Sequence, residues 1–228
     1  MEPTTILILY GVHTLARWWA GRNAQSSATV SGAALPTPVP AKVITLVGRT
    51  GVGKSSTANA LTGFEDFPVG AGHGTTRTVT ERAYINGYRL QDTPGLLDEI
   101  DYSACIWTAI KPSELVIYTT TSQLYRHELD LVARIHQSQQ QWDRESHTPG
   151  RRQLALYVNM QDVKELTMPS AVRAQEAAAI QQQVAAWVPR HKIVFGASAP
   201  TKAGRRGPAS IDALRTLIQS HIDHRDYQ

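Results

Sequence analysis

The octapeptide GRTGVGKS at residues 48–55 is the part of the chain best suited to chemistry. It satisfies G-x-x-x-x-G-K-[ST], a pattern whose glycines let successive backbone N–H groups point into one concave anion-binding loop. It follows the β-branched run 43–47 and precedes a predicted helix, whose N-terminus adds partial positive charge. Lys54 is placed to reach the β- and γ-phosphates of a nucleotide, and Ser55 to offer its hydroxyl to Mg²⁺. The alternative, a glycine-rich turn with a surface lysine, fits this strand–turn–helix context poorly. The predicted ligand-binding residues of the loop are Gly48, Thr50, Gly51, Val52, Gly53, Lys54, Ser55 and Ser56.

Two further segments could serve the phosphates. The sequence DTPG begins at Asp92, directly after a predicted strand, where a carboxylate can hold Mg²⁺ through water. The amide of Gly95 can bond the γ-phosphate, and a glycine permits this turn to change conformation when that phosphate leaves. Between the two motifs lies the glycine-rich segment 70–77, GAGHGTTR, in which Thr76 can close on Mg²⁺. We therefore predict a magnesium site made by Ser55, Thr76 and Asp92.

A third set of residues could read the base. The predicted strand 154–158 runs into Asn159, and Asp162 follows three residues later. A carboxylate at Asp162 can accept hydrogen bonds from guanine N1–H and the exocyclic amine, which adenine does not offer. Ser198 and Ala199 follow the last predicted strand, where small residues let a backbone amide approach guanine O6.

Together these five segments resemble the motifs of the Ras-like, translation-factor-related GTPases, and within them the bacterial Era/TrmE/Der-like group. The resemblance covers about residues 42–221 and implies bound GTP or GDP, Mg²⁺, two switch loops and a six-stranded sheet whose second strand is antiparallel. It implies that Lys54, Thr76 and Gly95 are the catalytic residues. It also implies that Asn159, Asp162, Ser198 and Ala199 surround the base.

Three positions depart from the pattern of that family. Met160 replaces the usual lysine of the guanine motif, and its thioether can still cover the base. Thr50 stands where Ras-like proteins carry a glycine, and its side chain would crowd a partner's arginine. Leu96 stands where Ras carries its water-positioning glutamine, and a leucine cannot orient water. We therefore predict slow hydrolysis.

These residues leave two functions open. The first is a molecular switch that hydrolyses GTP slowly and alternates between two switch-loop states. The second is an assembly module in which GTP joins two G domains, or the chain to a membrane, with little hydrolysis. Thr50 and Leu96 favour the second, whereas the intact set of Thr76, Asp92 and Gly95 favours the first. An ATPase would fit only if residues 159–162 did not contact the base.

Strands must alternate with helices to position these loops. Predicted strands lie at 43–47, 114–120, 154–158 and 192–195, and residues 78–92 read as two strands around an Asn86-Gly87 turn. Helices are predicted at 54–61, 123–142, 169–188 and 210–221, with the polar run 137–141 at a helix end. This order indicates an α/β fold, a mostly parallel sheet with helices on both faces. We therefore predict a G domain at 42–228, and two further segments precede it.

Those two segments are a predicted N-terminal amphipathic helix at 1–20 and a linker at 21–41 rich in Pro, Ser and Ala. The helix has an apolar stripe formed by Ile8, Val12, Leu15 and Trp19. It is too short and too interrupted by charge to be a secure membrane span. We expect it to dock on protein, or to make peripheral contact with a membrane through residues 3–20.

Composition sets the remaining bounds. The chain has 228 residues, of which 42% are hydrophobic and 18% charged, as in ordinary globular proteins, and its net charge is +4. A single cysteine, Cys105, excludes a disulfide scaffold and favours a reducing, cytoplasmic location. Basic residues cluster at 151–152, 190–192 and 205–206, which could attract RNA but more simply form a solvated face. The candidate partners are an unidentified protein effector and a nucleotide-dependent homodimer. RNA or the ribosome lacks support, because the residues after Asp162 suffice only to complete the G domain.

Overall fold

A computed structural model of the chain describes residues 42–69, 76–96, 103–198 and 211–226. The chain divides into two compact units, Met1–Val39 and Pro40–Gln228, and all the described residues belong to the second. The predicted N-terminal helix and the linker lie outside the described residues, as does Ala199.

The second unit is built on a six-stranded sheet in the order β2-β3-β1-β4-β5-β6. All neighbouring strands run parallel except β2 and β3, which are antiparallel. This arrangement confirms the α/β fold that the sequence predicts. The strands are β1 (Lys42–Val47), β2 (Thr80–Ala83), β3 (Tyr88–Asp92), β4 (Ser113–Thr120), β5 (Gln153–Val158) and β6 (Ile193–Phe195).

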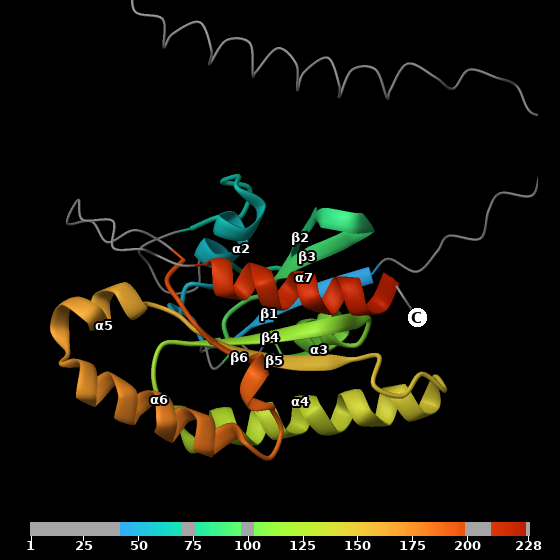
Figure 1. Ribbon diagram of the computed structural model, residues 1–228. Coiled ribbons are helices and arrows are strands. Elements are labelled where there is room, and N and C mark those ends of the chain that lie inside the picture. The colour runs from blue at the N-terminus through green and yellow to red at the C-terminus, as the bar shows by residue number, and fades with distance from the viewer. Residues whose placement is uncertain (1–41, 70–75, 97–102, 199–210, 227–228) are drawn as a thin grey trace, which may run out of the picture. The chain divides into compact units, whose positions relative to one another are not determined.

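Helices cover both faces of the sheet (Figure 1). The helices α2 and α7 pack on one face, and α3, α4 and α6 pack on the other. Because β1 lies between β3 and β4, the loops that follow these three strands meet at one edge of the sheet. The helices are α2 (Lys54–Thr62), α3 (Ser103–Ile110), α4 (Arg126–Glu145), α5 (Gln161–Thr167), α6 (Ser170–Val184) and α7 (Asp212–Asp226), and two short 3₁₀ turns are η1 (Ile85–Gly87) and η2 (Arg190–Lys192).

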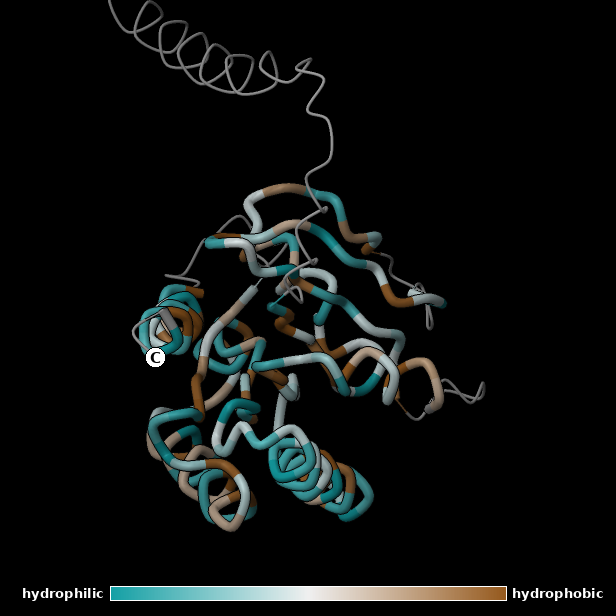
Figure 2. The backbone as a smooth tube through the Cα atoms, turned by 90° about the vertical axis from the view of Figure 1, so that its right-hand side faces the viewer, coloured by the Kyte–Doolittle hydropathy of each residue, from teal (hydrophilic) through white to brown (hydrophobic). Residues whose placement is uncertain are grey.

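Two apolar clusters, one on each face, form the core. Strand side chains alternate between them, so that Ile117 faces α2 and α7 while Val116 and Tyr118 face α3, α4 and α6. The central strands are therefore covered on both faces, and β4 is buried at every residue. Figure 2 shows the result, with hydrophobic segments in the interior of this unit and mixed hydropathy along the surrounding helices.

Several elements differ from their predicted bounds. The predicted hairpin forms, but its strands are joined through η1, in which Asn86 has a left-handed backbone. The helix α4 continues through the polar run 137–141, because the buried Gln139 donates to the backbone oxygen of Gln153. The helix α6 ends earlier than predicted and α7 later. The helices α3 and α5 were not predicted, since both are too short to display a clear helical period.

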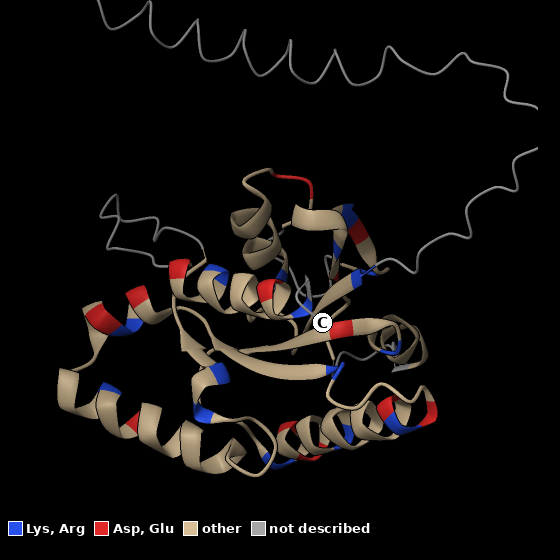
Figure 3. Cartoon of the chain, turned by 45° about the vertical axis from the view of Figure 1, so that its right-hand side comes forward, with Lys and Arg blue, Asp and Glu red and all other residues tan. Residues whose placement is uncertain are grey.

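The basic residues of the second half do not form one continuous patch among the described residues. Arg151 donates two hydrogen bonds to the buried carboxylate of Glu114, and Arg152 pairs with the buried Asp143 at 2.8 Å. Acidic and basic residues are also interspersed along α4 (Figure 3). The cluster 205–206 lies outside the described residues. Among the described helices, none combines the length and the apolar character that crossing a bilayer requires.

Candidate functional site

The loop between β1 and α2 has the backbone that an anion-binding nest requires. Gly53 caps α2 with a left-handed φ of 89°, and an added Cβ there would lie 2.4 Å from Asn159 Nδ2. Gly48 has a φ of 152°, and a Cβ there would lie 2.2 Å from the backbone oxygen of Thr119. Both positions therefore require glycine, for backbone conformation and for close approach of neighbouring segments.

Lys54 lies in the first turn of α2 and is buried. Its Nζ donates a hydrogen bond to the backbone oxygen of Arg49, 2.9 Å away within the same loop. This bond orients the lysine over the loop, and an ammonium group, which has three donors, can bond to the loop and to an anion together.

Three oxygen-bearing side chains meet beside this loop. Ser55 Oγ donates to Asp92 Oδ2 at 2.6 Å and lies 3.1 Å from Thr76 Oγ1, which is 3.4 Å from the same carboxylate oxygen. The structure thus brings together the three residues predicted to hold Mg²⁺, from α2, from the segment before β2 and from the end of β3.

Asp92 is completely buried, and its second oxygen, Oδ1, has no hydrogen-bond partner among the described residues. Burial raises the pKa of Asp92 above its ordinary value, against the opposing effects of the Ser55 hydrogen bond, the Lys54 charge and the Thr76 hydrogen bond. A buried carboxylate with an unpartnered oxygen is stabilised by a cation placed against it.

The described residues hold no cluster of three or more His, Cys, Asp or Glu side chains arranged for a metal ion. The arrangement around Asp92 is of another kind, one carboxylate and two hydroxyls. This donor set suits Mg²⁺, which binds proteins through one or two carboxylates and takes its other ligands from water and phosphate. The residues present therefore fit the ion that the sequence predicts.

The segment after Asp92 packs directly against the phosphate loop. Leu96 N–H donates to the backbone oxygen of Gly48 at 3.1 Å, and Arg49 and Leu96 form a parallel β-bridge. Gly95 touches Thr50 so closely that an added Cβ would lie 2.6 Å from the Thr50 backbone nitrogen. The Leu96 side chain is 9% exposed and belongs to the core cluster beneath α3 and α4. This leucine therefore faces the protein interior.

Asn159 joins two loops of the site. Its Nδ2 donates to the backbone oxygen of Val52 at 2.9 Å, and its Oδ1 accepts from the backbone N–H of Ser198 at 3.0 Å. The Ser198 hydroxyl lies 2.7 Å from Thr57 Oγ1 and 3.0 Å from the hydroxyl of Tyr157. Asn159 therefore connects the phosphate loop to the segment after β6.

Thr57 and Tyr157 were not among the predicted site residues. The sequence offered no signal for either, because a threonine inside a helix and a tyrosine inside a buried strand are ordinary core residues. Burial raises the pKa of Tyr157 to about 12, so its hydroxyl stays protonated and available as a donor.

The turn after β5 presents the residues predicted to contact the base. Met160 adopts a left-handed backbone with a φ of 60° and is 37% exposed. Asp162 lies half-buried in the first turn of α5. The left-handed residue turns the chain sharply between the strand and the helix, so Asn159 points inward while Met160 stays accessible.

A second group of residues missed by the sequence analysis supports the phosphate loop from α4. Arg49 Nε lies 3.5 Å from Glu128 Oε1, and its guanidinium stacks over the ring of Tyr125. Glu128 is 1% exposed and also accepts hydrogen bonds from the Tyr118 hydroxyl and the Tyr125 backbone N–H. Only the S/T-x-x-E form of a capping box is readily seen in a sequence, and here a tyrosine occupies the N-cap.

The fold and this loop define a P-loop nucleotide-binding domain. Residues 43–159, just over half of the chain, match the family model described as 50S ribosome-binding GTPase. The chain therefore belongs to this family, and the matched residues form a P-loop GTPase G domain.

Three relatives illustrate the likeness. The tRNA modification GTPase MnmE of Shewanella pealeana is 36% identical over 106 residues, which cover 40% of this chain and 23% of the relative. Era of Aquifex aeolicus, solved with GDP and AlF₄⁻, matches with a TM-score of 0.52 at 17% identity, over 78% of this chain and 56% of that one. Era in complex with MgGDPNP and a fragment of 16S ribosomal RNA matches with a TM-score of 0.53 at 16% identity, over 79% and 56%. The chain thus spans about a quarter of the curated relative and just over half of the Era chains, and the likeness to Era is one of fold.

Proposed function

We propose that this domain binds GTP and GDP with Mg²⁺, hydrolyses GTP slowly and acts as a molecular switch. The observation that carries the proposal is the meeting of Ser55, Thr76 and Asp92 beside the phosphate loop, with one carboxylate oxygen buried and lacking a hydrogen-bond partner. Membership of a GTPase family and the MgGDPNP bound in the Era structure support the same assignment.

Ser55, Thr76 and Asp92 would hold the ion. When bound, Mg²⁺ neutralises charge on the β- and γ-phosphates. The Ser55 hydroxyl, which donates to Asp92 in this structure, would turn a lone pair toward the ion. The negative charge of the buried Asp92 would face the same ion. Lys54, kept over the loop by the Arg49 carbonyl, would direct its remaining N–H donors at the phosphate oxygens.

Base selection would rest on Asp162. Asn159 holds the phosphate loop and the Ser198 segment in register through one N–H and the oxygen of its amide, and its second amide N–H would donate to the base. Asp162 would then accept from the guanine N–H groups, and the exposed Met160 would cover one face of the base. The contact of Ala199 with guanine O6 stays a prediction from the sequence, because this residue lies outside the described ones.

The position of Leu96 supports the proposal of slow hydrolysis. Its side chain is packed in the core, so no side chain at this position orients water in the described conformation. Gly95 and Thr50 are in contact, so a γ-phosphate entering the loop would have to displace the Gly95 segment. This contact would couple the nucleotide to the chain that follows Gly95, which is the basis of a switch.

The test compares nucleotides and two variants. We expect GTP and GDP, but not ATP, to bind in the presence of Mg²⁺ by calorimetry, and EDTA to weaken GTP binding. Asp162→Asn should shift preference from guanine toward xanthine nucleotides, because the amide reverses the donor pattern while the phosphate loop is unchanged. Lys54→Ala should abolish binding or turnover, whereas Lys111→Ala, at an exposed position, should not. Equal affinity for ATP and GTP would refute the base assignment.

The burial of Leu96 also supports a second candidate, a nucleotide-dependent assembly module with little hydrolysis. Single-turnover hydrolysis, measured together with molecular size in GDP and in a non-hydrolysable GTP analogue, separates the two. A dimer that forms only with the analogue, with no detectable turnover, would favour assembly. A monomer in both states that turns GTP over would favour the switch.

A further inference from the structure

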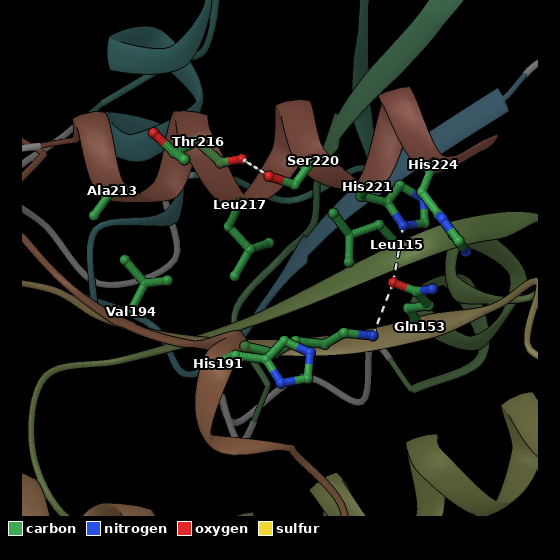
Figure 4. Close-up of a pocket in the computed structure, with 11 residues that line it drawn as sticks. Leu115, Gln153, His191, Val194, Ala213, Thr216, Leu217, Ser220, His221 and His224 are labelled. Atoms are coloured by element: carbon green, nitrogen blue, oxygen red, sulfur yellow. Dashed lines mark hydrogen bonds between the residues drawn. The ribbon is translucent and has the colours of Figure 1, made fainter. Parts of the chain in front are cut away.

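A cavity of about 530 Å³ lies away from the phosphate loop, between α7, η2 and the first residue of β5 (Figure 4). Its volume lies within the range of small-molecule sites. One part of its wall is apolar, formed by Leu115, Val194, Ala213 and Leu217. The remaining part is polar and carries cationic or neutral groups only, namely Gln153, His191, Lys192, Thr216, Ser220, His221 and His224.

Gln153 organises the polar part. Its Oε1 accepts a hydrogen bond from Lys192 Nζ at 2.8 Å and lies 3.0 Å from His221 Nδ1 (Figure 4). A lysine can only donate, so the atom that it contacts is the amide oxygen, and Nδ1 of a neutral His221 must then carry its proton. The amide NH₂ group of Gln153 and two of the three ammonium protons of Lys192 are left over by these bonds.

Lys192 lacks a carboxylate partner within the described part of the chain. The carboxylate of Glu114 acts on His221 through its charge, and it already accepts hydrogen bonds from Arg151 and Tyr88. The pKa of Lys192 is lowered by burial and by the neighbouring positive charge of Arg225. The site therefore holds a half-buried positive charge beside an apolar wall, and the described residues place no carboxylate against it.

We propose that this cavity is a binding site for a small organic anion, a single carboxylate or phosphate group on an apolar body. The anionic group would lie against Lys192 and the Gln153 amide, and the apolar body against Leu217 and Val194. An anion there supplies the charge that the protein does not, and hydrogen bonds to a charged group are the stronger ones. This site does not depend on the nucleotide site.

The probe is 1-naphthoate, with the uncharged 1-naphthamide as its neutral analogue, added to the full chain saturated with Mg²⁺ and GDP. Histidine ring signals in NMR spectra, assigned by single His→Gln variants, report the position of binding. We expect 1-naphthoate to shift the signals of His191, His221 and His224 in a saturable way. The signals of His127 and His136, on α4, serve as internal references and should not move.

Two variants test the two parts of the cavity separately. Lys192→Gln should weaken binding of 1-naphthoate about tenfold or more, whereas Lys111→Gln, which removes the same charge at an exposed position outside the cavity, should change it less than twofold. Ala213→Phe fills the apolar part from an exposed helix position without changing charge, and it should also abolish binding.

Three results would overturn the proposal. One is the absence of saturable binding of 1-naphthoate. Another is equal binding of 1-naphthamide, which would make the cavity a mere apolar groove. The last is unchanged affinity in Lys192→Gln. Because Ala213→Phe keeps every polar group, the proposal can be tested even if Lys192→Gln does not fold.

Discussion

Asp92 and Asp143 are two buried aspartates in opposite situations. Asp92 has an oxygen without a partner among the described residues, and burial raises its pKa. Asp143 accepts hydrogen bonds from the backbone N–H and the guanidinium of Arg152. A buried charge without compensation destabilises a fold, whereas a compensated one is costly to remove. We therefore propose that Asp92 serves the bound ion, whereas Asp143 serves the stability of the fold.

Replacing each with asparagine should have opposite effects on stability. In EDTA and without nucleotide, Asp92→Asn should keep or raise the free energy of unfolding, since its raised pKa means that charge at Asp92 opposes folding at neutral pH. Asp143→Asn should lower it by about 3 kcal/mol, because Arg152, whose side chain is only 15% exposed, is left without its charged partner. GTP turnover should fall about 100-fold in Asp92→Asn only. Chemical denaturation checks the stabilities, and a loss of stability in Asp92→Asn matching that of Asp143→Asn would contradict the assignment.

His221 gives the fold a pH dependence of predictable sign. It is 6% exposed, and burial, together with the positive charges of Arg225, Lys192 and His224, lowers its pKa to about 4 against the opposing charge of Glu114. In the unfolded chain His221 takes up a proton near the ordinary histidine pKa of about 6.5, and in the folded chain it does not. The contribution of the neutral His221 to stability is therefore fully present above pH 6.5.

As pH falls from 6.5 to 4, the free energy of unfolding should therefore decrease by about 3 kcal/mol through this residue alone. His221→Gln should lose that part of the pH dependence, while His127→Gln, at an exposed position, should follow the unmodified chain. Denaturant melts at pH 7, 5.5 and 4 measure the slopes. Parallel slopes for the unmodified chain and His221→Gln would show that His221 is not the titrating group.

At the scale of elements, α4 supports the phosphate loop through Arg49 and Glu128. The pair joins two segments that the strand order brings together, the loop after β1 and the first turn of α4 after β4. Glu128 is buried while Arg49 is half-exposed. Loss of Arg49 would therefore leave a buried charge uncompensated, whereas loss of Glu128 would leave an arginine that water can solvate. Nucleotide binding and the stability of α4 should consequently be linked.

Arg49→Gln should lower the free energy of unfolding by about 1–2 kcal/mol. This is less than the cost of breaking a fully buried ion pair, because the arginine is partly exposed to water. Its matched control is Arg89→Gln, which breaks a more exposed pair with Glu81 and should cost no more than about 0.5 kcal/mol. GDP affinity, measured by calorimetry, should weaken in Arg49→Gln and not in the control. If the two variants are equally stable, α4 does not support the loop through this pair.

At the scale of the whole molecule, the described residues that form the two core clusters lie between Ile44 and Ile222, within the compact unit Pro40–Gln228. We therefore predict that a truncated protein beginning at Ala41 folds by itself, with a melting temperature within a few degrees of the full chain and unchanged GDP affinity. Scanning calorimetry checks the first point. Aggregation of the truncated protein, or a much lower melting temperature, would refute the predicted boundary between the linker and the G domain.

The same pair of proteins tests the N-terminal helix predicted at 1–20. Co-sedimentation with anionic vesicles by the full chain and not by the truncated protein would assign membrane contact to residues 3–20. Equal behaviour of the two would remove that interpretation and leave docking on protein.

Local patterns in the sequence were sufficient for the architecture and for the phosphate loop. Runs of β-branched and apolar residues predict the buried strands because a parallel strand covered on both faces must be apolar throughout. The octapeptide 48–55 predicts its loop because the glycines act on their own backbone. The meeting of Ser55 with Asp92 was predicted on the same grounds, since each residue belongs to a motif with a fixed place at the end of a strand.

Contacts between distant segments were decided only by the tertiary structure. Spacing predicted that Asn159 contacts the base, and the fold shows in addition that its amide bonds to Val52 and Ser198. Leu96 appears in the sequence as a missing glutamine, and packing places it in the core. The cavity beside Lys192 depends on Gln153 and His221, which are 68 residues apart. Such contacts leave no local signal, because the sequence specifies which residues can be buried or paired, while the crossing of strands and helices determines which of them meet.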